Sequence, residues 1–481
     1  MENKLYSKLI CPVVLLIVLC FTGCYFYVYD IVDVPEQATA WTPLYLDASV
    51  KFNHNYLGAN EPDVHWSIKN AGTTKAKIAE VGYKTSCLLT MAPGTVLVSA
   101  SAEGFSKDFT ITVLPAPEEI HTLGTELISK NVNTAKNPVL LKIKLNLEVH
   151  WKDLMNMLSV ADRYVNLDLA ESTGTQIPDF SGPYSENKVM SIVLPESIIS
   201  IGDSAFSYCK GLTSISLGNN VLHIGDYAFS NCNELTDILI PDSVTSIGDY
   251  AFYNCKGLTS ISLGNSVSHI GNYVFYNCDE LSGILIPDSV ISIGNSVFAG
   301  CSNLTAIDVA PGNAVYTSID GILYNKTATS LIRCPIGKTG TIKIPDTVTG
   351  IEADAFESCA GLISVNIPDS VLSIGNYAFG GCTSLASVII GNKVETIGAS
   401  AFRYCTNLAS VNIPDSVLSI GNYAFDNCNR LVRVTFNGAI TQDGFDEDAF
   451  YPGDLRLRYF ANSGGQGTYT RTSGSDRWSK E

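Results

Sequence analysis

Charged side chains are scarce in this 481-residue chain, in which Asp, Glu, Lys and Arg together make up 16% of the residues. Hydrophobic residues make up 46%, so the chain can bury a sizeable core and does not have the composition of a disordered protein. Basic residues are scarcer than acidic ones, 30 against 47, and the net charge is −17. We find no cluster of Lys and Arg of the kind that contacts phosphates, so we expect no nucleic-acid partner.

The sequence also lacks the patterns that would indicate an active site. We find no nucleophile beside a base, no phosphate-binding loop and no pair of carboxylates in a cleft. Of the six histidines, only His223 and His269 share a position in the repeat described below. They lie two repeats apart, about 9.6 Å by strand spacing, which is too far for one metal ion. We expect surface histidines there, no enzyme and no cofactor.

The first residues have the layout of an export signal. A basic start is followed by an apolar stretch over residues 9–21 and by the tetrapeptide Phe21-Thr22-Gly23-Cys24. This tetrapeptide resembles a bacterial lipobox, in which the cysteine is lipidated and becomes the mature N-terminus. The alternative is an uncleaved anchor, because apolar character continues past Cys24 and reaches about 20 residues, enough to span a bilayer. We expect a lipoprotein signal peptide over 1–23 and lipid on Cys24, so the rest of the chain lies outside the cytoplasm.

The pattern over residues 30–116 predicts a β-sandwich. They are rich in Thr and Val, Val96, Val98 and Ala100 alternate with their neighbours, and turn signals separate the short apolar runs. The stretch Val64-His65-Trp66-Ser67, followed by APGTVLVSASAEGFSKDFTITV, resembles the bacterial Ig-like (Big-type) domains of surface proteins. Cys87 stands alone in this region, so no structural disulfide is implied.

Residues 117–188 predict a linker and an N-terminal cap. Alternation over 139–149 indicates a strand, and 165–169 indicates a second one. Between them, apolar residues recur at helical spacing: Trp151, Leu154, Met155, Leu158 and Ala161. A cap is needed because the first hydrophobic cross-section of a repeat array would otherwise face water.

A period of 23 residues dominates from 189 to 436. The unit is approximately LxxIxLPxxVxxIGxxAFxxCxx, and its phenylalanine recurs at positions 206, 229, 252, 275, 298, 356, 379, 402 and 425. One unit cannot bury its three apolar faces alone, but stacked copies build a continuous core. The period predicts a solenoid of nine coils, interrupted by a hairpin-like insertion over 303–344 that protrudes from the stack. A C-terminal cap with a Gly- and Ser-rich tail is expected over 437–481.

The repeated unit resembles the BspA-like leucine-rich repeat family of bacterial surface proteins. The nine copies of LxxIxLPxxVxxIGxxAFxxC carry this resemblance, and the stretch DGILYN…LIRCP in the insertion is also found in that family. The resemblance implies a mainly β fold, a leucine-rich repeat solenoid of 23-residue repeats, here preceded by the Ig-like domain. It also implies adhesion to host matrix proteins or to other cells.

One cysteine accompanies each phenylalanine, and we considered three roles for the nine. Stacked coils hold equivalent side chains parallel and in a line, so four thiolates do not converge on one metal ion. Parallel Cβ vectors also disfavour disulfides between neighbouring coils. The remaining role is a structural ladder of small buried thiols that donate S–H to backbone carbonyls. Its members are Cys209, Cys232, Cys255, Cys278, Cys301, Cys359, Cys382, Cys405 and Cys428.

The recurring tripeptide Pro-Asp-Ser has two interpretations. A row of its aspartates would suit calcium only if their oxygens converged closely. Alternate coils carry Gly-Asn instead, as at Gly264-Asn265, and both pairs are ordinary turn chemistry. We therefore expect turns here.

Because no active site is predicted, we expect the function to depend on the surface of the solenoid. The outward positions of the strands are small, polar and mostly uncharged, a composition that suits weak, extended contact with a protein, although a solvated sheet face is an equally good interpretation. The candidate binding residues are Thr213, Ser214, Ser216, Thr236, Asp237, Thr259, Ser260, Ser262, Asn366, Ser410 and Asn412.

The sequence therefore predicts an exported lipoprotein of the cell surface or outer membrane, anchored in the membrane by its lipid, that binds proteins through the solenoid. One alternative is a structural or envelope-associated scaffold without a host ligand. Another is a carbohydrate-binding module, which the sequence disfavours because we see no aromatic platform on the repeats. The ligand and the oligomeric state stay open.

Overall fold

The computed structural model describes residues 133–161, 163–180, 188–461 and 464–481. Before residue 133 it describes the strands β1 to β9, residue 71 and residues 120, 122–124 and 127. The predicted signal peptide and Cys24 lie outside the described residues. Within the part that is described, no helix has the length and apolar character to cross a membrane.

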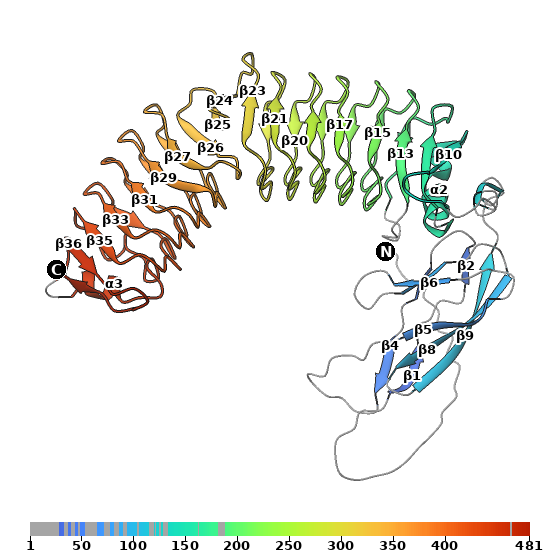
Figure 1. Ribbon diagram of the computed structural model, residues 1–481, viewed down its shortest axis with the longest axis horizontal. Helices are drawn as coiled ribbons and strands as arrows, with labels where there is room; N and C mark the ends of the chain where they lie inside the picture. The colour runs from blue at the N-terminus through green and yellow to red at the C-terminus, as the bar shows by residue number, and fades with distance from the viewer. Residues whose placement is uncertain are drawn as a thin grey trace, which may run out of the picture.

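The repeats form a solenoid of about 13 turns that curves into an arc (Figure 1). One strand of each turn belongs to a series that we call the long-strand sheet, in which the strands that pair between adjacent turns run parallel. Residues 23 apart are partners, as in Ser191↔Ser214 and Ile238↔Ile261. Its strands are β10 (Val139–Lys142), β11 (Val165–Asp168), β13 (Val189–Val193), β15 (Ser214–Ser216), β17 (Asp237–Leu239), β19 (Ser260–Ser262), β21 (Gly283–Ile286), β23 (Ala306–Val309), β27 (Gly340–Lys343), β29 (Leu362–Asn366), β31 (Ser387–Ile389), β33 (Ser410–Ile413) and β35 (Arg433–Phe436).

A second series of shorter strands, the short-strand sheet, follows the Val-x-x-Ile-Gly part of each unit. Its first parallel block consists of β12 (Gln176–Ile177), β14 (Ser200–Ile201), β16 (His223–Ile224), β18 (Ser246–Ile247), β20 (His269–Ile270) and β22 (Ser292–Ile293). Its second parallel block consists of β28 (Gly350–Ile351), β30 (Ser373–Ile374), β32 (Thr396–Ile397) and β34 (Ser419–Ile420).

The core is a set of columns in which equivalent side chains of successive turns stack. Phe252 is fully buried and packs between Phe229 and Phe275, with ring centroids 5.2 and 5.8 Å apart. These stacked rings combine with the buried Leu, Ile and Val of the two strand series, so each turn depends on both neighbours for its burial. This is the pattern expected of a repeat array, whose stability comes largely from interfaces between units.

Tight turns after each Ile-Gly explain the remainder of the motif. Gly248 lies against the preceding turn, where a Cβ would meet Asp226 Oδ1 at 2.5 Å and its backbone nitrogen at 2.7 Å. Each turn then contains two residues in the left-handed region, such as Tyr250 and Asn254 with φ of 57° and 58°. Asn adopts this region more readily than most residues, which explains its recurrence before the cysteine.

The N-terminal cap continues the long-strand sheet, because β10 pairs in parallel with β11, and β11 pairs in parallel with β13. The strand predicted over 139–149 is too long: β10 ends at Lys142, and helix α2 (Leu147–Ala161) begins within the predicted strand. The physical reason is that the Asn146 side chain accepts a hydrogen bond from the Glu148 N–H at 3.1 Å, which caps the helix. The helix buries the predicted apolar face, and Val149 is exposed.

The insertion predicted over 303–344 does not protrude from the stack. It contains β23 and β27 of the long-strand sheet, and between them β24 (Tyr316–Ile319), β25 (Ile322–Asn325) and β26 (Ser330–Arg333) pair antiparallel. β26 then pairs in parallel with β28, so the three strands lead into the short-strand sheet. Buried side chains, Leu323, Tyr324 and Leu331 among them, hold the segment in the core.

The predicted C-terminal tail folds back and closes the last turn. β36 (Gly467–Thr470) pairs antiparallel with β35, and β37 (Ser479–Lys480) pairs with β36. Helix α3 (Leu455–Tyr459) lies beside them, and Phe436, Tyr469 and Trp478 are buried. The Gly- and Ser-rich segment is therefore part of the cap.

The strands before residue 115 pair mainly antiparallel. One sheet has the order β2-β9-β8-β5, in which only β2 and β9 are parallel, a second has the order β3-β7-β6, and β1 pairs with β4. Val96, Val98 and Ala100 of β8 are buried, as the alternation indicated. The Ig-like sandwich over 30–116 stays a prediction. The strands are β1 (Val28–Val32), β2 (Gln37–Thr39), β3 (Leu44–Leu46), β4 (Ser49–Phe52), β5 (His65–Asn70), β6 (Lys77–Glu80), β7 (Ser86–Leu89), β8 (Gly94–Ala102) and β9 (Phe105–Leu114).

Candidate functional site

The eleven candidate binding residues lie on one surface, the outward side of the long-strand sheet, which we call the long-strand face. Each belongs to a long strand or directly precedes one. Thr213 is half-buried and the other ten are exposed: Ser214, Ser216, Thr236, Asp237, Thr259, Ser260, Ser262, Asn366, Ser410 and Asn412. The structure therefore brings them onto one face.

Two of the candidate threonines hold successive turns together. Thr213 Oγ1 donates to Met190 O at 2.8 Å, and Thr259 Oγ1 donates to Thr236 O at 2.9 Å. In both cases the acceptor belongs to the preceding turn, 23 residues earlier. A partner would have to compete with these bonds for the hydroxyl proton, so the two threonines contribute less to recognition than their position suggested.

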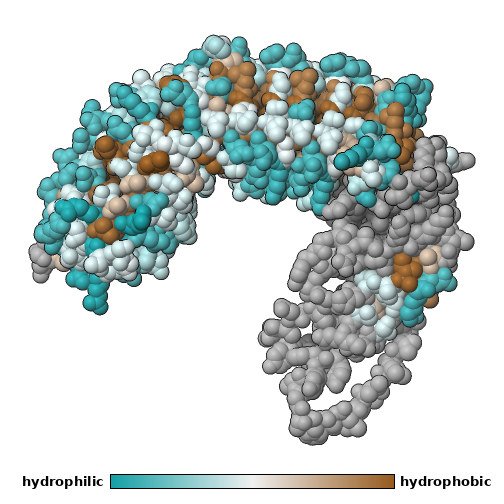
Figure 2. Space-filling view, viewed as in Figure 1, coloured by the Kyte–Doolittle hydropathy of each residue, from teal (hydrophilic) through white to brown (hydrophobic). Residues whose placement is uncertain are grey.

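Large apolar side chains interrupt the polar face on three of the long strands, β17, β21 and β31. Leu239, Leu285 and Ile389 are 68%, 56% and 61% exposed. In the register of the sheet, Leu239 is the partner of Ser262 and Ile389 is the partner of Asn366, so each apolar residue has a small polar neighbour. Figure 2 shows brown hydrophobic patches spaced along the solenoid between paler polar surface. Such side chains, isolated in a polar surround, are suited to anchor a protein partner.

The third of these side chains lies in a groove. A cavity of about 480 Å³ is lined by Asn366, Ile389, Asn412 and residues of the adjoining turns, among them Asp369 and Asn392. Two candidate residues and an exposed isoleucine therefore share one concave site on the long-strand face.

The Asp side chain of the Pro-Asp-Ser turns accepts a hydrogen bond from the next turn of the solenoid. Asp242 Oδ1 accepts the Asn265 N–H at 2.8 Å, and Asp369 Oδ1 accepts the Asn392 N–H at 2.7 Å. These carboxylates act as turn acceptors between coils. Within the described ranges, no group of three His, Cys, Asp or Glu side chains could hold a metal ion.

The two repeat histidines are both exposed, on β16 and β20. His223 Nδ1 lies 2.9 Å from Ser246 Oγ of the next turn. Neither histidine gathers other metal-binding groups around it in the part of the chain that the structure describes.

All nine cysteines of the ladder are buried as free thiols. Cys255 Sγ donates to Phe229 O at 3.0 Å, and the same bond links Cys278 to Phe252 at 3.2 Å. Burial raises the pKa of Cys255 to about 12, well above the ordinary value of 9.0. Because the thiolate is the reactive form, these thiols are unsuited to nucleophilic chemistry.

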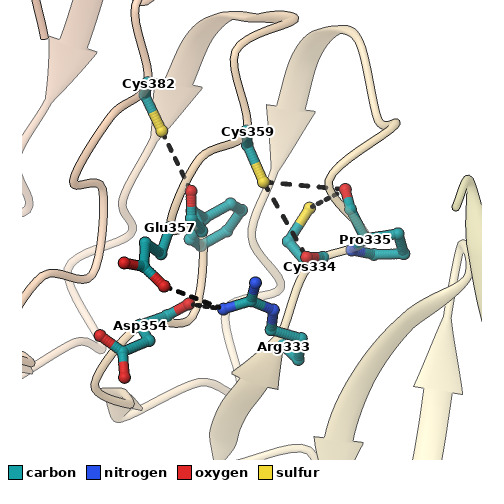
Figure 3. A network of polar contacts seen from close by, with 8 residues as sticks. Arg333, Cys334, Pro335, Asp354, Glu357, Cys359 and Cys382 are labelled. Carbon is teal, nitrogen blue, oxygen red and sulfur yellow. Dashed lines mark hydrogen bonds and ion pairs between the residues drawn. The ribbon is translucent and has the colours of Figure 1, made fainter. Parts of the chain in front are cut away.

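A tenth buried cysteine joins the ladder from the insertion. Cys334 Sγ and Cys359 Sγ both lie 3.7 Å from Pro335 O (Figure 3). Sequence reasoning missed this residue because it lies outside the 23-residue register. Its signal was the dipeptide Cys334-Pro335 directly after an apolar strand.

The expectation that the repeats carry no aromatic platform is wrong. Tyr227, Tyr250 and Tyr273 stack with centroids 4.6 and 4.8 Å apart, and Tyr253 stacks on Tyr276 at 5.4 Å. They occupy positions that the repeat consensus records as variable. The signal was a tyrosine two residues after Ile-Gly in three consecutive units. These residues lie in the turns between Ile-Gly and Cys, away from the long strands.

Comparison with known proteins identifies the repeats. The sequence profile of the BspA type leucine rich repeat region matches residues 176–318 and 336–454 in six copies, which is more than half of the chain. The unmatched interval contains β25 and β26. No curated protein matches the chain.

A comparison with solved structures also finds similar proteins. The pneumococcal vaccine antigen PcpA is 26% identical over 56% of this chain and 68% of its own, with a TM-score of 0.51. A leucine rich cell surface protein of Faecalibacterium prausnitzii is 33% identical over 56% of this chain and 72% of its own, with a TM-score of 0.49. A leucine-rich repeat protein of Bacteroides ovatus is 25% identical over 59% of this chain and 75% of its own, with a TM-score of 0.43.

Proposed function

Because the chain belongs to the BspA-type leucine-rich repeat family, whose members are bacterial cell-surface proteins, we propose that it is an exported surface protein that binds other proteins through the long-strand face. Leucine-rich repeats generally mediate protein binding, and their family is typically non-enzymatic. The proposed partners are host matrix proteins or proteins of other cells. The proposed attachment to the membrane is a lipid on Cys24, after removal of residues 1–23.

The observation that carries this proposal is the regular exposure of Leu239, Leu285 and Ile389 on a surface that is otherwise polar. Extended surfaces of stacked repeats are well suited to protein partners because each turn adds contact area along one face. The hydroxyl and amide groups around the anchors supply the polar rim of such an interface. Exposed leucines favour an adhesin over a scaffold without a host ligand.

The size of the effect follows from the exposed area of the anchors. Full burial of a Leu or Ile side chain stabilises by about 1.5–3 kcal/mol, and the three are already partly covered, so each contributes roughly 1 kcal/mol to binding. Removal of all three should cost about 3 kcal/mol, which is about a hundredfold in Kd.

The test uses the chain from residue 25 onward, titrated against immobilised collagen, laminin and fibronectin. The triple variant Leu239→Ser, Leu285→Ser, Ile389→Asn carries residue types that neighbouring turns already have at this position. We expect it to bind its matrix protein about a hundredfold more weakly.

The matched control changes three residues that are equally apolar but lie beside the short-strand sheet. Leu222, Ile291 and Leu418 are 39%, 53% and 61% exposed. The variant Leu222→Thr, Ile291→Thr, Leu418→Thr should bind like the unmodified chain. Equal losses in both triple variants would contradict the assignment of the face, and no saturable binding to any matrix protein would favour the scaffold alternative.

A further inference from the structure

A second concave site lies where the two regular blocks of the solenoid meet at the insertion. A cavity of about 590 Å³, which we call the notch, is lined by residues from both sides of the junction: Tyr276, Ser296, Arg333, Asp354, Glu357 and Tyr377. The buried apolar side chains form two clusters, one ending at Leu323 and the other beginning at Ile322. The notch therefore marks the break in the repeat, and its volume is typical of a small-molecule site.

One wall of the notch is the end of a tyrosine stack. Tyr276 packs one ring face on Tyr253, at 5.4 Å with an interplanar angle of 12°. The equivalent residue of the next turn is Ala299, which also lines the notch and carries no ring to cover the other face. The side of Tyr276 opposite Tyr253 is thus turned to the cavity.

The other wall carries Tyr377, which is 41% exposed. Its equivalents in the adjacent turns are Asp354 and Ser400, so no ring stacks on it from those turns. Tyr377 has φ of 53°, and Asp354 and Ser400 adopt φ of 59° and 54°. The left-handed backbone at this position therefore accepts other residues as well as tyrosine.

Charged groups of both signs also line the notch: Arg333, Asp354 and Glu357, which Figure 3 shows near one another. Arg333 is 8% exposed, donates through Nη1 to Asp354 O, and lies 4.0 Å from Glu357 Oε2. Its Nη2 is buried and has no hydrogen-bond partner among the residues that the structure describes. Burial raises the pKa of Glu357, and Asp354 adds to this effect. A buried guanidinium nitrogen without an acceptor is costly, so Arg333 would gain from an additional hydrogen-bond partner.

This combination narrows the class of ligand. The two carboxylates disfavour an anion, and the guanidinium disfavours a cation. A purely apolar ligand would leave the serines and the charged groups unsatisfied. A neutral saccharide satisfies both requirements, because its ring C–H groups pack on an aromatic face and each of its hydroxyls can donate and accept.

We propose that the notch is a binding site for a neutral oligosaccharide, with Tyr276 and Tyr377 as stacking residues and Arg333, Asp354 and Glu357 as hydrogen-bonding partners. This activity is separate from protein binding, because the notch is formed by the turns around the insertion and shares no residue with the long-strand face. The alternative considered from the sequence, a carbohydrate-binding module, lacked only the aromatic residues that the structure provides.

The experiment begins with the chain from residue 25 on a printed array of neutral oligosaccharides, two to six sugars long, built from glucose, galactose, mannose and their N-acetylamino forms. The saccharide with the strongest signal is then titrated calorimetrically into the unmodified chain and its variants. Tyr276→Ala and Tyr377→Ala should each weaken binding about tenfold, the loss expected for one aromatic contact.

The matched control is Tyr227→Ala, at the opposite end of the tyrosine stacks, which should leave Kd within about twofold. Thermal unfolding of each variant establishes that it is folded. Array binding that is lost in the two notch variants and kept in the control supports the proposal. Binding to no saccharide on the array overturns it, and so does binding that neither notch variant weakens.

Discussion

The reactivity of the cysteine ladder tests whether the turns pack as described. We consider the chain from residue 25 onward with the single substitution Cys87→Ser. Of the 14 cysteines in the sequence, this chain keeps ten, and all ten are buried free thiols. Its reaction with an aromatic disulfide reagent therefore reports only on the solenoid.

Two effects suppress this reaction in the folded protein. Cys255 is 0% exposed, so the reagent cannot reach its sulfur unless a turn opens. Burial also raises the pKa of this thiol from 9.0 to about 12. At pH 8 the fraction of thiolate then falls from roughly one tenth to roughly one ten-thousandth, which alone slows the reaction about a thousandfold.

The assay follows the coloured thiolate that the reagent releases at pH 8. In native buffer we expect less than one thiol per chain to react while all ten react promptly in concentrated guanidinium chloride. The same reaction with the unmodified chain from residue 25, which retains Cys87, measures what this one additional thiol contributes. Prompt native reaction of several ladder thiols would refute the packing and would reopen a chemical role for these cysteines.

Three further predictions follow from the packing. Phe252→Ala removes a ring held between two others and should cost about 3–5 kcal/mol, measured by denaturation and by faster labelling of Cys255, whereas Phe252→Leu should cost less; equal losses would contradict the stacked core. Gly248→Ala should destabilise the solenoid because the new Cβ would lie 2.5 Å from Asp226 Oδ1, and an unchanged melting temperature would contradict this. The carboxylate of Glu148 accepts the Thr175 N–H and hydroxyl, which holds its pKa below the ordinary value of 4.5. Such a group adds stability above its unfolded pKa that is lost as pH falls through the folded value, so the stability advantage over Glu148→Gln should narrow in acid; a constant advantage would contradict the role of the charge.

The repeat sequence predicted the solenoid because each position of the 23-residue unit meets its own copy in the next turn. The structure of one unit therefore predicts the structure of the others. Columns such as Phe229, Phe252 and Phe275 could be predicted directly from the spacing. The eleven candidate residues of the long-strand face could be placed on one surface for the same reason. Alternation along each strand assigns one side to the core and the other to solvent.

The extent of the solenoid was underestimated. From the sequence we counted only the nine coils that carry the full motif, whereas the structure has about 13 turns. β10 and β11 belong to the same parallel sheet as β13 although their turns lack the phenylalanine and the cysteine. Pairing in a parallel sheet depends on backbone hydrogen bonds, so turns without the motif can still extend the stack.

The tyrosine stacks and the notch could not be predicted from the consensus. Tyr250 occupies a position where tyrosine alternates irregularly with serine and aspartate, so the consensus leaves it variable and does not show which turns stack. The stack depends on tyrosine in consecutive turns, and the notch depends on how the insertion joins two blocks. Arg333 belongs to the insertion, and it meets Glu357 of the following repeat turn there. Features that arise where a turn departs from the repeat consensus can be located only in the folded structure.

The account rests most directly on display of the solenoid at the cell surface, because a binding face that is not exposed cannot attach a cell to a partner. The deciding measurement treats intact cells with a membrane-impermeant, amine-reactive biotin reagent and compares labelling before and after lysis. Exposed lysines such as Lys256, Lys343 and Lys393 are available for this reaction. We predict labelling of the chain in intact cells while a cytoplasmic marker stays unlabelled; labelling that occurs only after lysis would contradict the proposed function.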